Sequence, residues 1–165
     1  MTTTFTHLLA AHYLRAHRAA LGWLGDEQEA REVAQEALLR AYRARDRYDP
    51  ARPFAPWLRQ IVRNACKDAA ARGRRRAVGG LDADRLADAQ PGADERMVQA
   101  DANGRLRAAI AELSPDYREI VVLRHFEDLS YAEIAEALDV PIGTVMSRLY
   151  RARKALAERL QEVAP

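Results

Sequence analysis

The hydrophobic residues recur at helical spacing along nearly the whole chain, and no stretch alternates apolar and polar residues as a half-buried strand would. Helices are predicted over residues 5–23 and, behind a capping aspartate, over Asp26–Tyr48. Three prolines interrupt residues 49–56, so a loop is predicted there. A third helix should then open at Trp57 and end near Arg72.

The composition changes in the middle of the chain, where residues rich in glycine, alanine and aspartate predict a flexible linker. Beyond it, Ser114–Pro115 is typical of an N-cap followed by a first-turn proline, and Ser130–Glu133 forms a capping box. We therefore expect an all-α protein made of two small helical domains joined by a flexible linker. The predicted boundaries are 1–76 for the first domain, 77–93 for the linker and 94–165 for the second domain.

The end of the chain predicts a helix-turn-helix, because a short capped helix, a turn at 139–141 and a longer basic helix over 142–163 follow one another. One stripe of the last helix is expected to be buried: Ile142, Val145, Leu149, Ala152 and Leu156. Another face suits the major groove of DNA: Thr144, Ser147, Arg148 and Arg151. A solvated basic helix end is the alternative. However, cations near a helix start are disfavoured by the helix dipole and therefore indicate a function.

Two features of the first domain suggest binding surfaces. Phe54 and Trp57 flank the proline-rich loop, and Arg59, Arg63 and Lys67 follow at intervals of four residues. Aromatic rings beside cations suit unpaired bases, although two plain core residues would give the same pattern. On the preceding helix, a leucine stands within a polar face, which suggests either a protein contact or an ordinary exposed leucine. That face consists of Glu32, Gln35, Glu36 and Leu39.

Charge and cysteine content narrow the functional classes. The net charge is only +2, but basic residues crowd residues 72–76 and 148–159, with an acidic stretch between them. The single cysteine, Cys66, excludes an intramolecular disulfide, and no secretory signal or membrane span is apparent, so a cytoplasmic protein without membrane insertion is expected. The histidines form no ligand cluster with Cys66, so neither a metal nor another cofactor is predicted.

Four segments, in this order, resemble the extracytoplasmic-function (ECF) sigma factors of the sigma-70 family. Residues 29–42 are similar to the family's polymerase-binding helix and residues 53–64 to its promoter-melting segment. Residues 113–124 and 141–153 are similar to its −35-binding domain. The resemblance implies a helical region 2 and region 4, and no enzymatic activity.

The resemblance also implies partners: core RNA polymerase, promoter DNA and, commonly in the family, an anti-sigma factor. Region 2 would bind the β′ clamp helices through Glu32, Gln35, Glu36 and Leu39. It would open the −10 element with Asp49, Arg52, Phe54, Trp57, Arg63, Asn64 and Lys67. Region 4 would read the −35 element and touch the β flap. The acidic residues from Asp82 to Glu95 would suit the RNA exit path, although a merely soluble linker would have the same composition. Arg31, Asp139 and Met146 depart from common family residues.

Two other functional classes remain as alternatives. An autonomous helix-turn-helix regulator would bind an operator without polymerase, but such proteins are usually dimers and no dimerisation helix is evident. A small enzyme acting on nucleic acid would need paired carboxylates, a metal cluster or an activated nucleophile. Glu32 and Glu36 are one turn apart, but they lie on the face expected to bind a partner.

Overall fold

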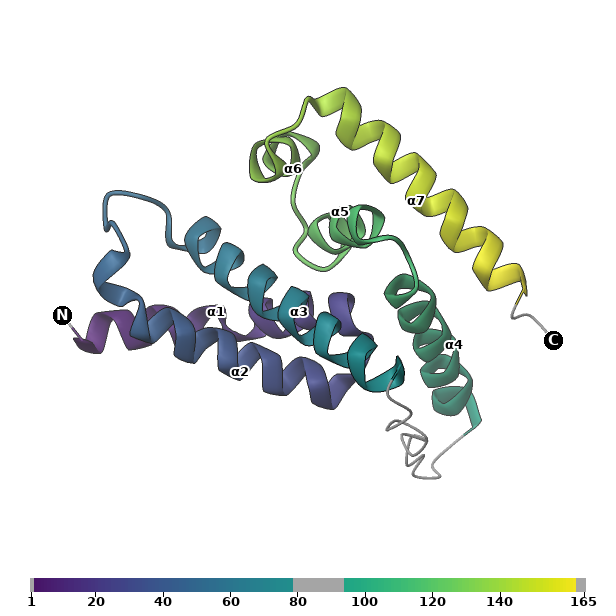
Figure 1. Ribbon diagram of the computed structural model, residues 1–165, viewed down its shortest axis with the longest axis horizontal. Helices are drawn as coiled ribbons and strands as arrows, with labels where there is room; N and C mark the ends of the chain where they lie inside the picture. The colour runs from purple at the N-terminus through teal and green to yellow at the C-terminus, as the bar shows by residue number, and fades with distance from the viewer. Residues whose placement is uncertain (1, 79–93, 163–165) are drawn as a thin grey trace.

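The computed structural model describes residues 2–78 and 94–162, all of whose regular elements are helical (Figure 1). The predicted linker, including the acidic stretch assigned to the exit path, falls almost entirely outside the described residues and side chains. The elements are α1 (Thr2–Leu24), α2 (Glu27–Arg43), the 3-10 turn η1 (Arg45–Arg47), α3 (Phe54–Val78), α4 (Asp94–Ala111), α5 (Pro115–His125), α6 (Tyr131–Leu138) and α7 (Ile142–Glu162).

Helices α1, α2 and α3 pack side by side as a three-helix bundle (Figure 1). Gly25 ends α1 with a φ of 77°, and Asp26 caps α2 by accepting a hydrogen bond of 2.7 Å from the Glu29 amide. The buried core of the bundle is built largely from alanines, with Trp23, Leu58 and Cys66 among the larger members. Small side chains let the three backbones approach closely.

Helices α4 to α7 form the second unit, in which α7 lies across α4, α5 and α6. Its core contains Ile110, Ile120, Ile134 and Leu149, all at most 3% exposed. Helix α1 also contacts α4 and α5, so the two units are packed against one another. The prediction of an all-α protein with two helical parts is confirmed.

Three local predictions were wrong. Helix α2 ends at Arg43, before the predicted end at Tyr48. Helix α3 begins at Phe54 rather than Trp57, because Pro56 lies in the first turn, where an amide has no intrahelical acceptor to lose. It also continues through Gly73 to Val78, since one glycine costs a helix only about 1 kcal/mol.

Candidate nucleic-acid and polymerase interfaces

The first half of α7 has a buried side and an exposed side. Val145, Leu149 and Ala152 are at most 1% exposed and share one hydrophobic cluster with Ile134 of α6. The residues predicted to meet DNA lie outside this buried stripe, with Ser147 and Arg151 exposed and Thr144 and Arg148 half-buried. The Ser147 hydroxyl donates to the Thr144 carbonyl at 3.1 Å, which leaves its oxygen free to accept another bond.

Ile142 was wrongly assigned to the buried stripe, because it is 51% exposed. Met146 and Tyr150 follow it at intervals of four residues and are 56% and 72% exposed. These three apolar side chains therefore form an exposed row beside Ser147 and Arg151. All three lie outside the DNA-facing set predicted from the sequence, although Met146 and Tyr150 each stand one residue beyond a buried position.

The start of α7 is held in place by the caps of α6. Ser130 and Glu133 form the predicted capping box, and hydrogen bonds from Ser130 lower the pKa of the exposed Glu133 carboxyl. At the other end of α6, Asp139 has a φ of 52°, a left-handed conformation that aspartate tolerates better than most residues. The turn of the helix-turn-helix is therefore fixed by local chemistry.

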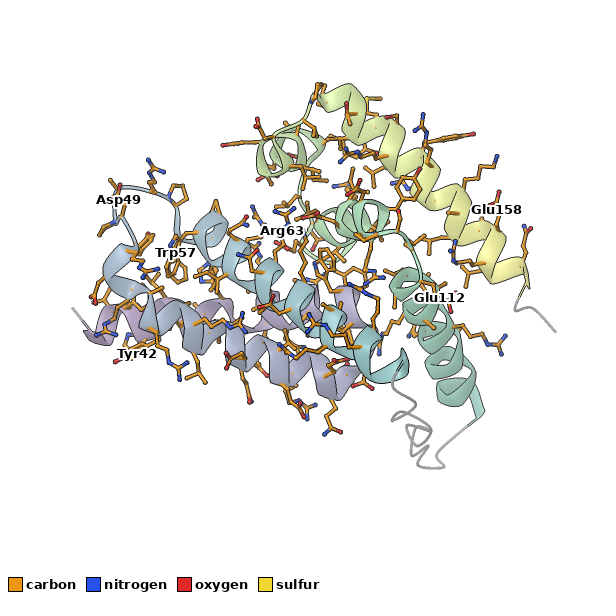
Figure 2. The ribbon with its side chains drawn as sticks, in the orientation of Figure 1. Tyr42, Asp49, Trp57, Arg63, Glu112 and Glu158 are labelled. Atoms are coloured by element: carbon orange, nitrogen blue, oxygen red, sulfur yellow. The ribbon has the colours of Figure 1, made fainter. Side chains whose placement is uncertain are left out.

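An aromatic cluster supports the loop that precedes α3. Phe54 is 7% exposed and meets Phe5 and Tyr48 edge-on at centroid distances of 5.5 and 5.3 Å, whereas Trp57 is half-buried at the same end of the bundle (Figure 2). Tyr48 donates from its hydroxyl to the Arg52 carbonyl at 2.7 Å. Phe54 is thus placed to support the loop, and Trp57 is the ring nearer to solvent.

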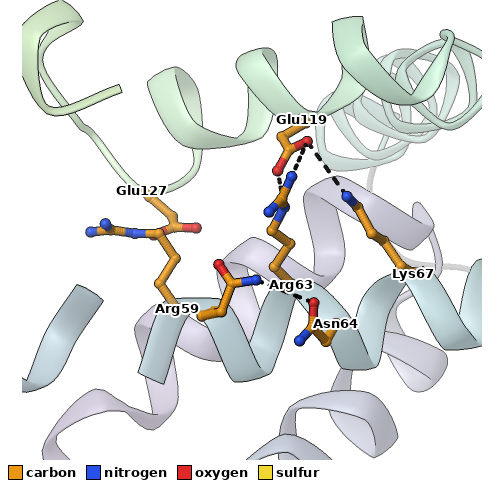
Figure 3. A network of polar contacts seen from close by, with 7 residues as sticks. Arg59, Arg63, Asn64, Lys67, Glu119 and Glu127 are labelled. Carbon is orange, nitrogen blue, oxygen red and sulfur yellow. Dashed lines mark hydrogen bonds and ion pairs between the residues drawn. The ribbon is translucent and has the colours of Figure 1, made fainter. Parts of the chain in front are cut away.

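The basic residues of α3 are not free, because carboxylates of the second unit face them (Figure 3). Arg59 Nε donates to Glu127 Oε2 at 2.8 Å. Arg63 engages both oxygens of Glu119, with Nη2 at 3.0 Å from Oε2 and Nε against Oε1. Lys67 Nζ lies 3.7 Å from the same Oε2. Asn64 instead accepts a hydrogen bond of 3.4 Å from Gln60 and remains exposed.

Both carboxylates are removed from solvent, with side-chain exposures of 8% for Glu119 and 6% for Glu127. Burial raises the pKa of the Glu127 carboxyl, and the hydrogen bond from Arg59 opposes that shift. Neither residue was predicted from the sequence, because they lie 56 and 68 positions from their partners and no local pattern connects them.

The predicted polymerase face of α2 is open to solvent. Glu32 and Gln35 are exposed and Leu39 is 52% exposed. Glu36 is half-buried and accepts from Arg40 Nε at 2.9 Å, while Arg40 Nη1 also donates to Asp68 at 2.8 Å. Hydrogen bonds to Asp68 and Glu36 raise the pKa of Arg40. The face therefore presents an acidic surface around one exposed leucine.

The described residues contain no group of three or more histidine, cysteine, aspartate or glutamate side chains placed to hold a metal. Within the same residues, no helix combines the length and the apolar character needed to cross a membrane.

Comparison with known proteins identifies the family. Residues 8–76 match the model of Sigma-70 region 2, and residues 103–156 match that of Sigma-70 region 4. The chain is 36% identical to the RNA polymerase sigma-H factor of Pseudomonas aeruginosa over 82% of this chain and 75% of that protein. It is 32% identical to the ECF RNA polymerase sigma factor SigW of Bacillus subtilis over 85% of this chain and 80% of that one.

The chain belongs to the ECF sigma factors. As a sigma factor it directs promoter-specific initiation by RNA polymerase, and the autonomous regulator is not favoured. The bundle α1–α3 corresponds to region 2, and the helix-turn-helix corresponds to region 4. The individual site residues and the domain boundaries stay predictions.

Two solved structures share the fold of this sigma factor. CnrH in complex with the cytosolic domain of CnrY superimposes with a TM-score of 0.69 at 23% identity, covering 99% of this chain and 92% of that one. The sigma factor RpoE in complex with the anti-sigma factor NepR, from Bartonella quintana, gives 0.66 at 24% identity, covering 98% and 99%.

Proposed function

We propose that α7 reads the −35 element, α3 and its preceding loop open the −10 element, and α2 binds the β′ clamp helices of core polymerase. The observation that carries this proposal is the division of α7, whose buried stripe leaves short polar, long cationic and apolar side chains exposed together. Hydroxyls and arginines can bond phosphates and guanine, and apolar side chains can contact the thymine methyl group. Because apolar side chains can make this contact, we add Met146 and Tyr150 to the proposed DNA-facing residues.

In region 2, the half-buried Trp57 ring is proposed to contact an unpaired base, while Phe54, whose ring centroid lies 5.5 Å from that of Trp57, supports it. Arg63, Asn64 and Lys67 would hold the strand, and Asp49 and Arg52 would shape the loop, since the Asp49 carboxylate already accepts from the Ala51 amide at 3.0 Å. Stacking contributes about 1–3 kcal/mol per base. Region 4 would also touch the β flap.

We further propose that the protein performs no chemistry of its own and acts in the cytoplasm, where the polymerase is. The match to RpoE, which was solved with the anti-sigma factor NepR, supports an anti-sigma factor as a further partner. The predicted boundaries of the two domains, 1–76 and 94–165, are part of the same proposal.

Transcription in vitro with purified core polymerase and a promoter library tests the proposal. Defined start sites should appear only when both proteins are present. Glu36→Lys combined with Leu39→Ala should weaken core binding at least tenfold, because it reverses a charge and removes the exposed leucine of the α2 face. Leu14→Ala, at a site on α1 that is 71% exposed, is the control for loss of one exposed leucine.

Two results would contradict the proposal. Undiminished affinity of the double variant for core polymerase, with native helicity by circular dichroism, would remove α2 as the polymerase-binding face. Tight, sequence-specific binding to promoter DNA by the free protein, with no effect of core polymerase on start sites, would favour the autonomous regulator.

A further inference from the structure

The basic row of α3, defined as Arg59, Arg63 and Lys67, is the part of region 2 best suited to a nucleic-acid backbone. In this structure region 4 faces it, although the Lys67 side chain remains 43% exposed. Two carboxylates, Glu119 and Glu127, engage all three cations, and both are buried by the same contact (Figure 3). A buried carboxylate needs a cationic partner to offset its loss of hydration, whereas an exposed ion pair contributes little.

Apolar packing holds the two regions together beside these ion pairs. Val122 of α5 is fully buried within the hydrophobic cluster of region 2, and Phe126 packs against both cores. Gly22 of α1 lies so close to them that a methyl group at its Cα would come within 2.8 Å of the Phe126 ring and 2.9 Å of Val122. The contact between the two regions therefore leaves no room for even one additional methyl group at Gly22.

A buried arginine adds a third set of contacts. Arg118 donates to the Trp23 carbonyl near the end of α1 at 3.4 Å and to the Leu113 carbonyl after α4 at 3.1 Å. It also contacts the Ala111 carbonyl. One cation thus satisfies carbonyls at the ends of helices from both regions, where the helix dipole favours positive charge.

We propose that region 4 is an internal competitor of promoter DNA, in which Glu119 and Glu127 occupy the basic row of α3 in place of phosphates until the two regions separate. This inference rests on the proposed role of α3 in holding the −10 strand. A guanidinium that engages a carboxylate through a hydrogen bond and an ion pair cannot hold a phosphate with the same donors. Free protein in the closed state would therefore bind single-stranded DNA weakly, and any partner that binds the open state better would release the row.

Energy transfer between two dyes measures the closure without DNA or polymerase. The dyes are attached at Asp46→Cys in η1 and Glu158→Cys in α7, both exposed, in a Cys66→Ala background. Two variants should lower the transfer efficiency by unrelated means. Glu119→Gln removes the counter-charge of Arg63 and Lys67, and Gly22→Ala inserts a methyl group against Phe126 without changing any charge. Asp116→Asn, an exposed site on the same helix, is the control for loss of one negative charge.

Binding of a short, fluorescent, single-stranded oligodeoxynucleotide of mixed sequence then measures the competition. Apparent affinity scales with the fraction of molecules that can bind, so an open fraction of about one tenth in the wild type gives a gain of about tenfold on opening. Gly22→Ala and Glu119→Gln should both show this gain, whereas Asp116→Asn should bind like the wild type.

The two measurements test the closed state and the competition with DNA separately. Low transfer already in the wild type would overturn the closed state, and high transfer in both opening variants would overturn the roles of Glu119 and Gly22 in holding it. Lower transfer with unchanged DNA affinity would overturn the competition. Adding Arg63→Ala and Lys67→Ala to Gly22→Ala separates this inference from the role of α3. If DNA binding by that variant persists while the closure data stand, the −10 assignment fails and region 4 covers the row for another reason.

Discussion

At the scale of single residues, Cys66 shows how burial sets chemistry. The side chain is 0% exposed within the core of region 2, and burial, followed by the nearby carboxylates of Glu127 and Glu29, raises the pKa of its thiol to about 12. Reactive cysteines are thiolates in exposed, electropositive surroundings. Cys66 is therefore a packing residue whose thiol stays protonated while the region is folded.

Alkaline pH should destabilise region 2 through this residue. The folded pKa is raised above the ordinary value of about 8.5, so the stabilising contribution of the neutral thiol is complete below that value and is lost as the pH rises toward about 12. Urea unfolding at pH 7 to 10 should show a steeper loss of stability in the wild type than in Cys66→Ala. Equal slopes for the two proteins, or rapid reaction of the native thiol with Ellman's reagent at pH 8, would contradict it.

Individual residues also mark the limits of sequence reasoning. Asp26, Ser130 and Asp139 were predictable because a cap or a turn involves only neighbours in the chain. Ile142 was not, because helical spacing gives the side of the helix on which a residue lies, whereas burial also needs a neighbouring element to cover it. The first turn of α7 stands at the edge of the molecule, where Ile142 remains exposed (Figure 1).

At the scale of the element, α7 is expected to carry residues with two different roles. Some would contact phosphates and position the protein, and others would contact base edges and read the sequence. Arg148 and Arg151 can reach base edges, and a bidentate pair with guanine contributes about 1–3 kcal/mol of discrimination. Loss of a phosphate contact instead weakens all sequences alike and lowers the salt slope by about one. Loss of a base contact therefore changes the preference among promoters, whereas loss of a phosphate contact weakens binding to all promoters equally.

Promoters carrying single −35 substitutions should distinguish these roles when transcribed by holoenzymes with Arg148→Ala, Arg151→Ala or Tyr150→Ala. At least one arginine variant should lose its preference at one or two adjacent base pairs and keep it elsewhere. Tyr150→Ala should lose preference at a pair that carries a thymine methyl group. Arg153→Ala, exposed on α7 outside the predicted DNA-facing set, serves as the control. Uniform losses in all three variants would mean that this surface only positions the helix.

The order of elements was predictable, but some of their ends were not. The helix-turn-helix followed from two local signals, a capping box and a turn, and each helix of region 2 followed from the spacing of its apolar residues. Pro56 shifted the start of α3 because the same residue that interrupts a helix interior is tolerated in a first turn. The sequence pattern alone does not say which of these two positions a proline takes.

At the scale of the whole molecule, the contact between region 2 and region 4 could not be predicted from the sequence pattern. The row of cations on α3 was only predicted to be a binding surface, and a basic row does not reveal whether it faces DNA or the protein's own carboxylates. Glu119 and Glu127 become its partners only after α5 has been placed against α1 and α3. Long-range pairing of this kind depends on the packing of helices that are individually predictable.

Salt should act on this contact in a graded way. Ion pairs weaken as the Debye length falls from about 10 Å at 0.1 M to about 3 Å at 1 M, whereas the packing of Gly22 against Phe126 carries no charge. Energy transfer in the doubly labelled wild type should therefore decline with sodium chloride but not disappear. The decline should be shallower in Glu119→Gln, which has already lost two of the ion pairs. Transfer that does not depend on salt in the wild type would contradict this prediction.

The ring of Phe5 has a practical consequence for anyone who produces this protein. It stands in the first turns of α1, and it meets Tyr48, Phe54 and Trp57 at centroid distances of 6.1, 5.5 and 6.0 Å. The aromatic rings that support the loop proposed to open the promoter thus pack against Phe5. Proteolytic loss of Phe5 during purification would remove this support and would disturb promoter opening, although Phe5 is not among the residues proposed to contact DNA.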